Sequence, residues 1–174
     1  MRNNDIWLWP QTDVHKFSYT NSSEVFENFF SGLFSPYRVV YISRARFAFS
    51  IINEICGYSR GSLVFTQPYS SWCVLSSMAE LVTPQVTSPL DCAYQTIYHQ
   101  WGHKTLVNKN IYRNILIEDA VDSNFINFSA EDFFPNGARF CLISLPKIMR
   151  LPVGAIVVMR YDDDYTRFKS IMRN

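Results

Sequence analysis

Short apolar runs separated by polar turns dominate the second half of the sequence. Three of these runs, at residues 115–117, 140–143 and 155–159, are continuous rather than alternating. A continuous run of this length is typical of a strand buried on both faces, because hydrophobic layers cover both rows of its side chains. The pattern therefore predicts a mostly parallel sheet with helices packed against it.

The first half of the sequence alternates between β-rich and helix-periodic segments. Residues 38–42 and 62–66 are rich in β-branched and aromatic side chains and predict two strands. Ser43 is a suitable N-cap for a helix of about thirteen residues that ends before Gly57, a residue type common just after a helix. A second helix is predicted over residues 73–82.

The middle of the sequence predicts shorter and less regular elements. Residues 83–90 contain two prolines and are expected to be irregular or an edge strand. Residues 95–102 predict a third core strand, and residues 104–113 have room for a helix of about two or three turns. A loop rich in phenylalanine is expected over residues 124–136.

These elements predict an α/β fold, with a mostly parallel sheet of about six to seven strands and helices on both faces. Residues 1–36 are expected to form an irregular, aromatic-rich N-terminal arm, with a short helix over residues 23–34. Residues 37–160 form the predicted α/β domain. Residues 161–174 are expected to be a polar tail that frays.

The charge and composition of the chain argue against nucleic acid or a membrane as its partner. The 174 residues carry a formal charge of only +1, so no basic surface for nucleic acid is expected. No apolar run reaches the roughly 18 residues of a membrane span, and the N-terminus lacks the apolar core of a signal peptide, so we expect a cytoplasmic protein. Only 18% of residues are charged and 16% are aromatic, which favours either a partner-covered surface or a large aromatic core.

The histidines and cysteines point to structural roles. His15, His99 and His103 show no spacing typical of metal ligands, and the four cysteines show none either. His99 is interpreted as a hydrogen-bonded structural residue. All four cysteines are interpreted as reduced, so no metal site is predicted.

Polar side chains follow two of the predicted inner strands. Asp119 closes the run at residues 115–117, and Ser144 and Lys147 follow the run at residues 140–143. Ligands of open α/β sheets bind beyond the carboxyl ends of the strands. We therefore expect the Asp119 carboxylate and the Lys147 amine to face a common site.

These residues resemble a known family. Glu118-Asp119-Ala120, then Ser144-Leu145-Pro146-Lys147, then Gly154-Ala155 are similar to motifs of the sugar aminotransferases that use pyridoxal phosphate, the DegT/StrS type. The resemblance implies that Lys147 is the catalytic lysine, which condenses with the cofactor aldehyde. It implies that Asp119 faces the pyridine nitrogen and that Ser144 reaches the cofactor phosphate. The implied fold is a truncated large domain of fold-type I enzymes, whose last core strand is antiparallel.

Two strand-to-helix turns extend the resemblance. Ala45 and Arg46 occupy the turn where the family has Ser-Gly-Thr or Ser-Gly-Arg to bind the phosphate, and Arg44 adds a second positive charge there. Ser71 and Trp72 follow Pro68 as a threonine and a ring-stacking aromatic do in the family. The chain departs from the pattern in two ways: Ala45 adds a methyl group where the family has glycine, and Asp122 replaces a glutamine.

Two functions follow from this resemblance. In the first, the chain transfers an amino group from glutamate to a keto-sugar nucleotide of surface polysaccharide synthesis, as a homodimer. In the second, it is a shortened, non-catalytic relative that serves in binding or assembly, or one half of a split aminotransferase with a separately encoded partner. An unrelated small α/β domain is the third interpretation.

Overall fold

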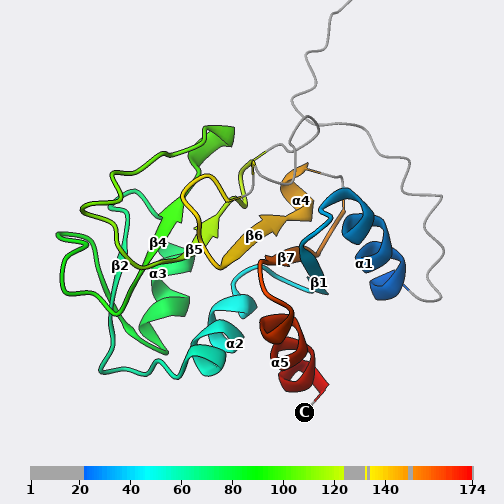
Figure 1. Cartoon of the computed structure of the whole chain (residues 1–174), viewed down its shortest axis with the longest axis horizontal. Helices are drawn as coiled ribbons and strands as arrows, with labels where there is room; N and C mark the ends of the chain where they lie inside the picture. Colours follow the sequence, from blue (N-terminus) through cyan, green and yellow to red (C-terminus); the bar gives the residue numbers. More distant parts are fainter. Residues whose placement is uncertain (1–21, 124–131, 133, 149–150, 174) are drawn as a thin grey trace, which may run out of the picture.

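The sheet confirms the predicted fold class. The computed structural model describes residues 22–123, 132, 134–148 and 151–173. Within them, seven strands form one sheet in the order β1-β7-β6-β5-β4-β2-β3 (Figure 1). The strands are β1 (Arg38–Ile42), β2 (Leu63–Thr66), β3 (Thr83–Gln85), β4 (Tyr94–Tyr98), β5 (Ile115–Asp119), β6 (Phe140–Ser144) and β7 (Ala155–Met159).

Six strands of this sheet run in one direction. Strands β2 to β6 pair in parallel, whereas β7 runs antiparallel to both of its neighbours, β6 and β1. All five residues of β7 are buried, as expected for a central strand covered on both faces. Strand β3 has only three residues and lies at the edge, which is one of the two outcomes expected for the proline-containing segment.

Helices cover both faces of the sheet. On one face, α2 and α5 contribute Phe49, Ile52 and Phe168 to a core that also holds Met78 of α3. On the other face, α1 contributes Phe26, Phe30 and Phe34. The full burial of each such side chain stabilises the fold by about 1.5–3 kcal/mol. The helices are α1 (Ser22–Leu33), α2 (Phe47–Cys56), α3 (Trp72–Ala79), α4 (Leu145–Ile148) and α5 (Asp162–Arg173).

Both ends of the described chain belong to the domain, which corrects the predicted arm and tail. Residues 1–21 lie outside the described residues. Helix α1 confirms the short helix predicted over residues 23–34, and it packs on the sheet instead of forming part of an irregular arm. The expected frayed tail is α5, in which Phe168 and Asp164 are fully buried. Asp164 binds the Arg139 guanidinium through both carboxylate oxygens, and aspartates in its first turn suit a helix N-terminus.

Three element boundaries differ from the sequence prediction. The helix predicted from Ser43 begins only at Phe47, because residues 44–46 form a turn in which the Phe47 N–H donates to the Arg44 carbonyl at 3.1 Å. Strand β4 ends at Tyr98 and is followed by a 3₁₀ turn at Gln100–Gly102. The helix predicted within residues 104–113 is not formed.

The remaining expectations concern the end of α2, the loop over residues 124–136 and the lack of a membrane span. Helix α2 ends as predicted at Gly57, which is left-handed at φ +72°. Most of the loop predicted over residues 124–136 lies outside the described residues. Among the residues that the structure describes, no helix has the length and apolar character needed to cross a bilayer.

Candidate functional site

Backbone hydrogen bonds tie three chain segments together at the carboxyl edge of the parallel strands. Leu145, just after β6, donates its N–H to the Gly154 carbonyl at 3.0 Å, and Gly154 donates to the Ser43 carbonyl after β1 at 2.9 Å. Gly154 has φ +122°, and a Cβ there would lie 2.8 Å from Cε2 of the Tyr41 ring. Only glycine fits this position without displacing Tyr41.

A cavity of about 290 Å³ opens at this edge. Its lining comes from the turn after β1, the start of α3, the end of β5 and the connection from β6 to β7. Five of the seven predicted site residues line it: Ala45, Arg46, Ser71, Ser144 and Lys147.

The lining also includes residues that the sequence analysis did not assign to a site. Ser43 was predicted as a helix cap, and neither Cys73 nor Val121 was given a role. All three line the cavity. Only Ser43 had a sequence signal, because it directly follows a predicted strand; the other two are placed by the way α3 and the end of β5 pack.

Lys147 lies in the short helix α4, with nearly half of its side chain exposed. Its ammonium group donates a hydrogen bond to Oδ1 of Asp122, the residue that stands where the family has glutamine. The Asp122 carboxylate is less than one-fifth exposed, so this ion pair is partly shielded from water. The lysine of the predicted site is therefore held by a charged partner.

Asp119 is not among the residues that line this cavity, although Val121, to which it is bonded, is. In the sheet Asp119 pairs in register with Leu142, which packs against α2, so both side chains are on the α2 face. Asp119 is 2% exposed and accepts the Val121 N–H at 3.3 Å. Burial raises the pKa of its carboxyl to about 6, although the Val121 N–H and the positive charge of Lys147 both oppose that rise.

Trp72 does not lie in this cavity. It is the first residue of α3, it is 79% exposed, and it lines a separate hollow together with Phe47 of α2. Its neighbours Ser71 and Cys73 face the cavity instead. The structure therefore brings together the lysine, the serines and Arg46 but not the predicted stacking ring.

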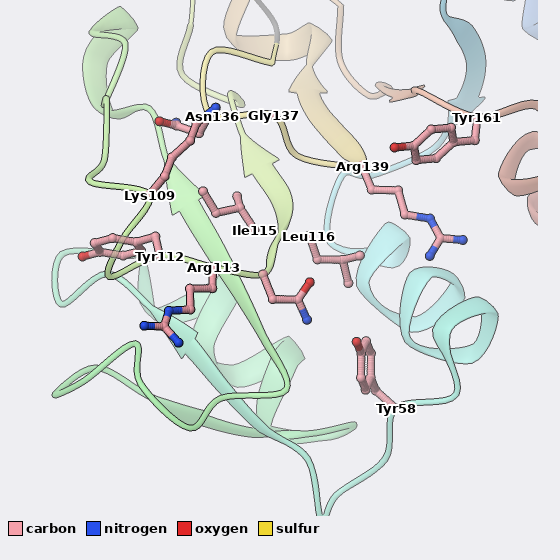
Figure 2. Close-up of a pocket in the computed structure, with 11 residues that line it drawn as sticks. Tyr58, Lys109, Tyr112, Arg113, Ile115, Leu116, Asn136, Gly137, Arg139 and Tyr161 are labelled. Carbon is pink, nitrogen blue, oxygen red and sulfur yellow. The ribbon is translucent and has the colours of Figure 1, made fainter.

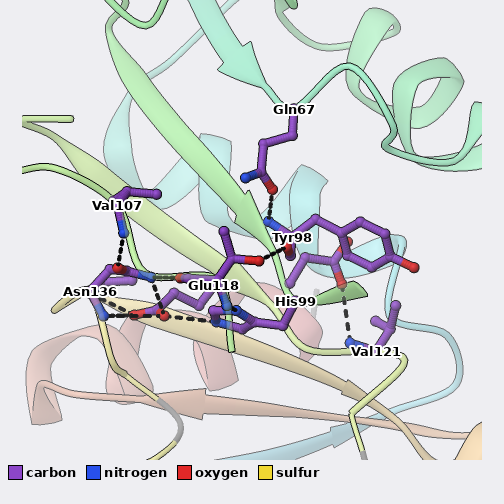
Figure 3. Close-up of polar contacts among 10 residues, drawn as sticks. Gln67, Tyr98, His99, Val107, Glu118, Val121 and Asn136 are labelled. Atoms are coloured by element: carbon purple, nitrogen blue, oxygen red, sulfur yellow. Dashed lines mark hydrogen bonds and ion pairs between the residues drawn. The ribbon is translucent and has the colours of Figure 1, made fainter. Parts of the chain in front are cut away.

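A buried polar network lies on the opposite face of β5 (Figure 3). Glu118 is fully buried and accepts hydrogen bonds from the Ala138 N–H at 3.1 Å, the Asn136 side-chain amide at 3.1 Å and Nε2 of His99 at 2.8 Å. Because the Thr105 N–H donates to Nδ1 of His99, the ring proton is assigned to Nε2. The prediction that His99 is a structural residue is confirmed.

This network explains the missing helix between residues 104 and 113. Thr105 is bound to His99, and the Val107 N–H donates to Oδ1 of Asn136 at 3.0 Å. These bonds fix Thr105 and Val107 beside Glu118 of β5 (Figure 3), in a segment that forms no helix. The network thereby fixes the strand that carries Asp119.

Comparison with known proteins gives one family and one fold. Residues 25–171 match the protein family described as "Putative PLP-dependent aminotransferase". A DegT DnrJ EryC1 StrS aminotransferase from Brucella abortus has 12% identity and a TM-score of 0.66, over 84% of this chain and 48% of that chain. The ntda protein from Bacillus subtilis, with bound cofactor PMP, has 15% identity and a TM-score of 0.67, over 83% of this chain and 38% of that chain.

A third similar structure is DesI in the presence of its TDP-sugar product, with 14% identity and a TM-score of 0.65, over 85% of this chain and 43% of that chain. At these identities the solved structures establish the fold alone. The chain spans less than half the length of each of the three. A comparison with curated protein sequences gives no match.

Proposed function

Because the chain belongs to the family described as "Putative PLP-dependent aminotransferase", we propose that its cavity binds pyridoxal phosphate and serves amino-group transfer to a keto-sugar nucleotide. One observation carries the proposal. Lys147 lines a cavity at the carboxyl edge of the sheet, and Asp119, which accepts the N–H of the lining residue Val121, is near enough for the charge of Lys147 to lower its pKa. An amine and a carboxylate are the two groups that this cofactor requires from a protein.

The phosphate end of the cofactor fits the side chains of the turn after β1. The N–H groups of Phe47, Ala48 and Phe49 already donate to carbonyls within that turn, at 3.0 to 3.3 Å. The start of α2 therefore offers few free backbone donors to an anion. Arg44 and Arg46 both line the cavity, and they would supply the positive charge in place of the amides.

Three hydroxyl groups complete this end of the cavity. Ser43, Ser71 and Ser144 line it from three different connections. A hydroxyl donates to phosphate oxygens without adding charge, so the serines would orient a phosphate that the two arginines neutralise. The methyl group of Ala45 lies in the same lining, where it narrows the approach to the backbone.

The lysine end of the cavity is built around one ion pair. When bound, pyridoxal phosphate would supply an aldehyde for the amine and a pyridine ring that accepts electron density from the substrate. The Lys147 amine reacts only when it is uncharged, so its ammonium must release a proton. Oδ1 of Asp122 is the acceptor that the ammonium contacts, and it is therefore the atom placed to hold that proton.

The buried carboxyl group suits a partner with positive charge. With a pKa of about 6, Asp119 is mostly ionised at neutral pH although its site has little water. A protonated pyridine nitrogen beside it would offset the cost of that buried charge. Asp119 would in return keep the nitrogen protonated.

The substrate class and assembly extend the proposal beyond the cavity. The sugar-nucleotide class is supported by the fold shared with DesI, whose structure holds a TDP-sugar product. Assembly as a homodimer and a role in polysaccharide synthesis are supported by the motif resemblance, and a cytoplasmic location is supported by the lack of a membrane-spanning helix among the described residues. They are parts of the proposal that the cavity alone does not carry.

Reductive labelling tests the cofactor site directly. The protein is incubated with pyridoxal phosphate, reduced with borohydride and digested, and the modified lysine is located by mass spectrometry. We expect the label on Lys147, its loss in Lys147→Ala and its retention in Lys109→Ala, which removes an exposed lysine at the opposite edge of the sheet. A protein that takes no label, or a label that persists in Lys147→Ala, contradicts the proposal.

Transfer itself needs a second measurement. In protein that has not been reduced, the same site is loaded with cofactor, and glutamate is added as amino donor while the cofactor absorbance is followed. A spectral change that requires both glutamate and Lys147 supports amino-group transfer. Loading without any response to glutamate would limit the function to cofactor binding.

A further inference from the structure

A second cavity lies at the opposite edge of the sheet from the cofactor site. Its volume is about 380 Å³, and Ile115 and Leu116 at the start of β5 and Arg139 just before β6 line it (Figure 2). The cofactor cavity lies beyond the carboxyl ends of these strands, so the two sites share no lining residue. The proposed function uses no part of this second cavity.

The lining of this second cavity carries positive charge without a carboxylate. Lys109, Arg113 and Arg139 contribute to it, and none of the described residues in this lining is an aspartate or a glutamate. Among the described residues, neither Lys109 nor Arg113 forms an ion pair, and Arg113 donates from Nε only to the Asn110 carbonyl at 3.2 Å. Two cations therefore face this cavity without a charged partner in that part of the chain.

Arg139 has a different role in the same lining. Its guanidinium binds both oxygens of the buried Asp164, and Nη1 lies 3.8 Å from Sγ of Cys56. That ion pair fixes the side chain and offsets its charge. The excess charge of the cavity thus comes from Lys109 and Arg113, which the segment before β5 provides.

The walls of the second cavity are rigid and offer hydroxyl donors. Tyr58 packs against the buried Tyr94 with 4.9 Å between ring centroids, and Tyr112 packs edge-on against Phe65 at 5.6 Å. In Figure 2, Leu116 lies between Arg113 and Arg139, and Tyr58 faces the same space. The hydroxyl groups of Tyr112 and Tyr161 have no hydrogen-bond partner among the residues that the structure describes.

From this arrangement we propose that the second cavity binds a small molecule that bears a phosphate group. An ammonium, a guanidinium and phenolic hydroxyls are donors that match phosphate oxygens, and arginine binds phosphate through two parallel N–H bonds. The volume is that of a site for a small metabolite. The tyrosine rings and Leu116 provide an apolar surface for the remainder of the molecule.

Pyrophosphate titration tests the second cavity, with isothermal calorimetry on the full chain. Because the cofactor cavity also carries arginines, two double variants are compared. The first replaces Lys109 and Arg113 of the second cavity by glutamine, and the second replaces Arg44 and Arg46 of the cofactor cavity by glutamine. We expect the first pair of changes to weaken one class of pyrophosphate binding at least about tenfold, since two charged contacts are lost. We expect the second pair to leave that class unchanged.

Two controls keep the outcome interpretable. Arg167→Gln removes an exposed cation of α5 and should bind pyrophosphate as the unmodified chain does. Reductive labelling of Lys147 is measured on the same variants, so a failure of the cofactor proposal is seen separately. The inference is overturned if the double variant Lys109→Gln, Arg113→Gln binds pyrophosphate as the unmodified chain does. It is also overturned if replacing Arg44 and Arg46 abolishes all pyrophosphate binding. Both residues of the first pair are exposed, and unchanged urea unfolding verifies that the fold persists.

Discussion

Replacing Asp119 by asparagine should make the protein more stable at neutral pH and less able to hold its cofactor. The carboxyl is 2% exposed, and burial raises its pKa from an ordinary value of 3.8 to about 6. Asparagine keeps an oxygen that can accept the Val121 N–H, and it has no charge to desolvate. The same change removes the carboxylate that would keep the pyridine nitrogen protonated.

The sign and size of the effect follow from proton linkage. The folded state binds this proton more tightly than the unfolded chain does, so the stability contributed by Asp119 is highest below pH 4 and falls as pH rises to about 6. At about 1.4 kcal/mol for each pH unit, the difference between 3.8 and about 6 corresponds to about 3 kcal/mol. Asp119→Asn should recover up to about that amount at pH 7 and almost none at pH 4.

Urea unfolding at a series of pH values between 4 and 8 measures this difference. Asp162→Asn is the matched control, because Asp162 is exposed, bonded to Arg38 at 2.5 Å, and has its pKa lowered by that bond. The stability that the ionised Asp162 carboxylate contributes to the fold is lost as pH falls. Asp162→Asn should therefore be less stable than the parent at neutral pH, not more stable. An Asp119→Asn protein that is less stable than the parent at pH 7, or that differs from it equally at every pH, would refute the reasoning.

Three further changes test the surroundings of the site. Asp122→Asn should slow labelling of Lys147 several-fold at fixed pH, because the carboxylate that accepts the ammonium proton is lost; equal rates by mass spectrometry would count against that role. Glu118→Gln should cost about 2–4 kcal/mol in urea unfolding, because an amide turns a donor toward buried N–H groups, whereas Glu80→Gln on the surface should cost little. Gly154→Ala should destabilise by about 1–3 kcal/mol through its clash with Tyr41, and a neutral result would contradict the backbone geometry there.

The sequence predicted the sheet well because strand burial leaves a direct pattern. The continuous runs at residues 115–117, 140–143 and 155–159 all form strands with buried side chains on both faces. The resemblance to sugar aminotransferases of the DegT/StrS type is confirmed by the family match and by the shared fold. Gly57 and the edge strand at Thr83–Gln85 also follow from local rules, since a left-handed cap and a proline-containing edge need no tertiary information.

The errors fall where tertiary contacts decide the structure. Asp162–Arg173 is polar on average, but the burial of Phe168 and of Asp164, which is paired with Arg139, makes it a packed helix. The segment before β5 is not helical because His99 and Asn136, which both bind Glu118, hold Thr105 and Val107, and the sequence pattern does not reveal such a network. Trp72 has the residue type and chain position of a stacking ring, but the direction of its side chain depends on how α3 begins.

The two departures from the family pattern act in a compensating way on the charge of the cofactor cavity. In the family a glycine turn lets backbone amides approach a phosphate, whereas here that turn satisfies its own amides and Arg44 and Arg46 line the cavity. A phosphate monoester carries about −1.5 to −2 charges at neutral pH, which two arginines match. Lys147 would add a third positive charge, and Asp122 pairs with it. The Asp122 carboxylate, which alone would repel a phosphate, thus balances the lysine and would leave the arginines to bind the anion.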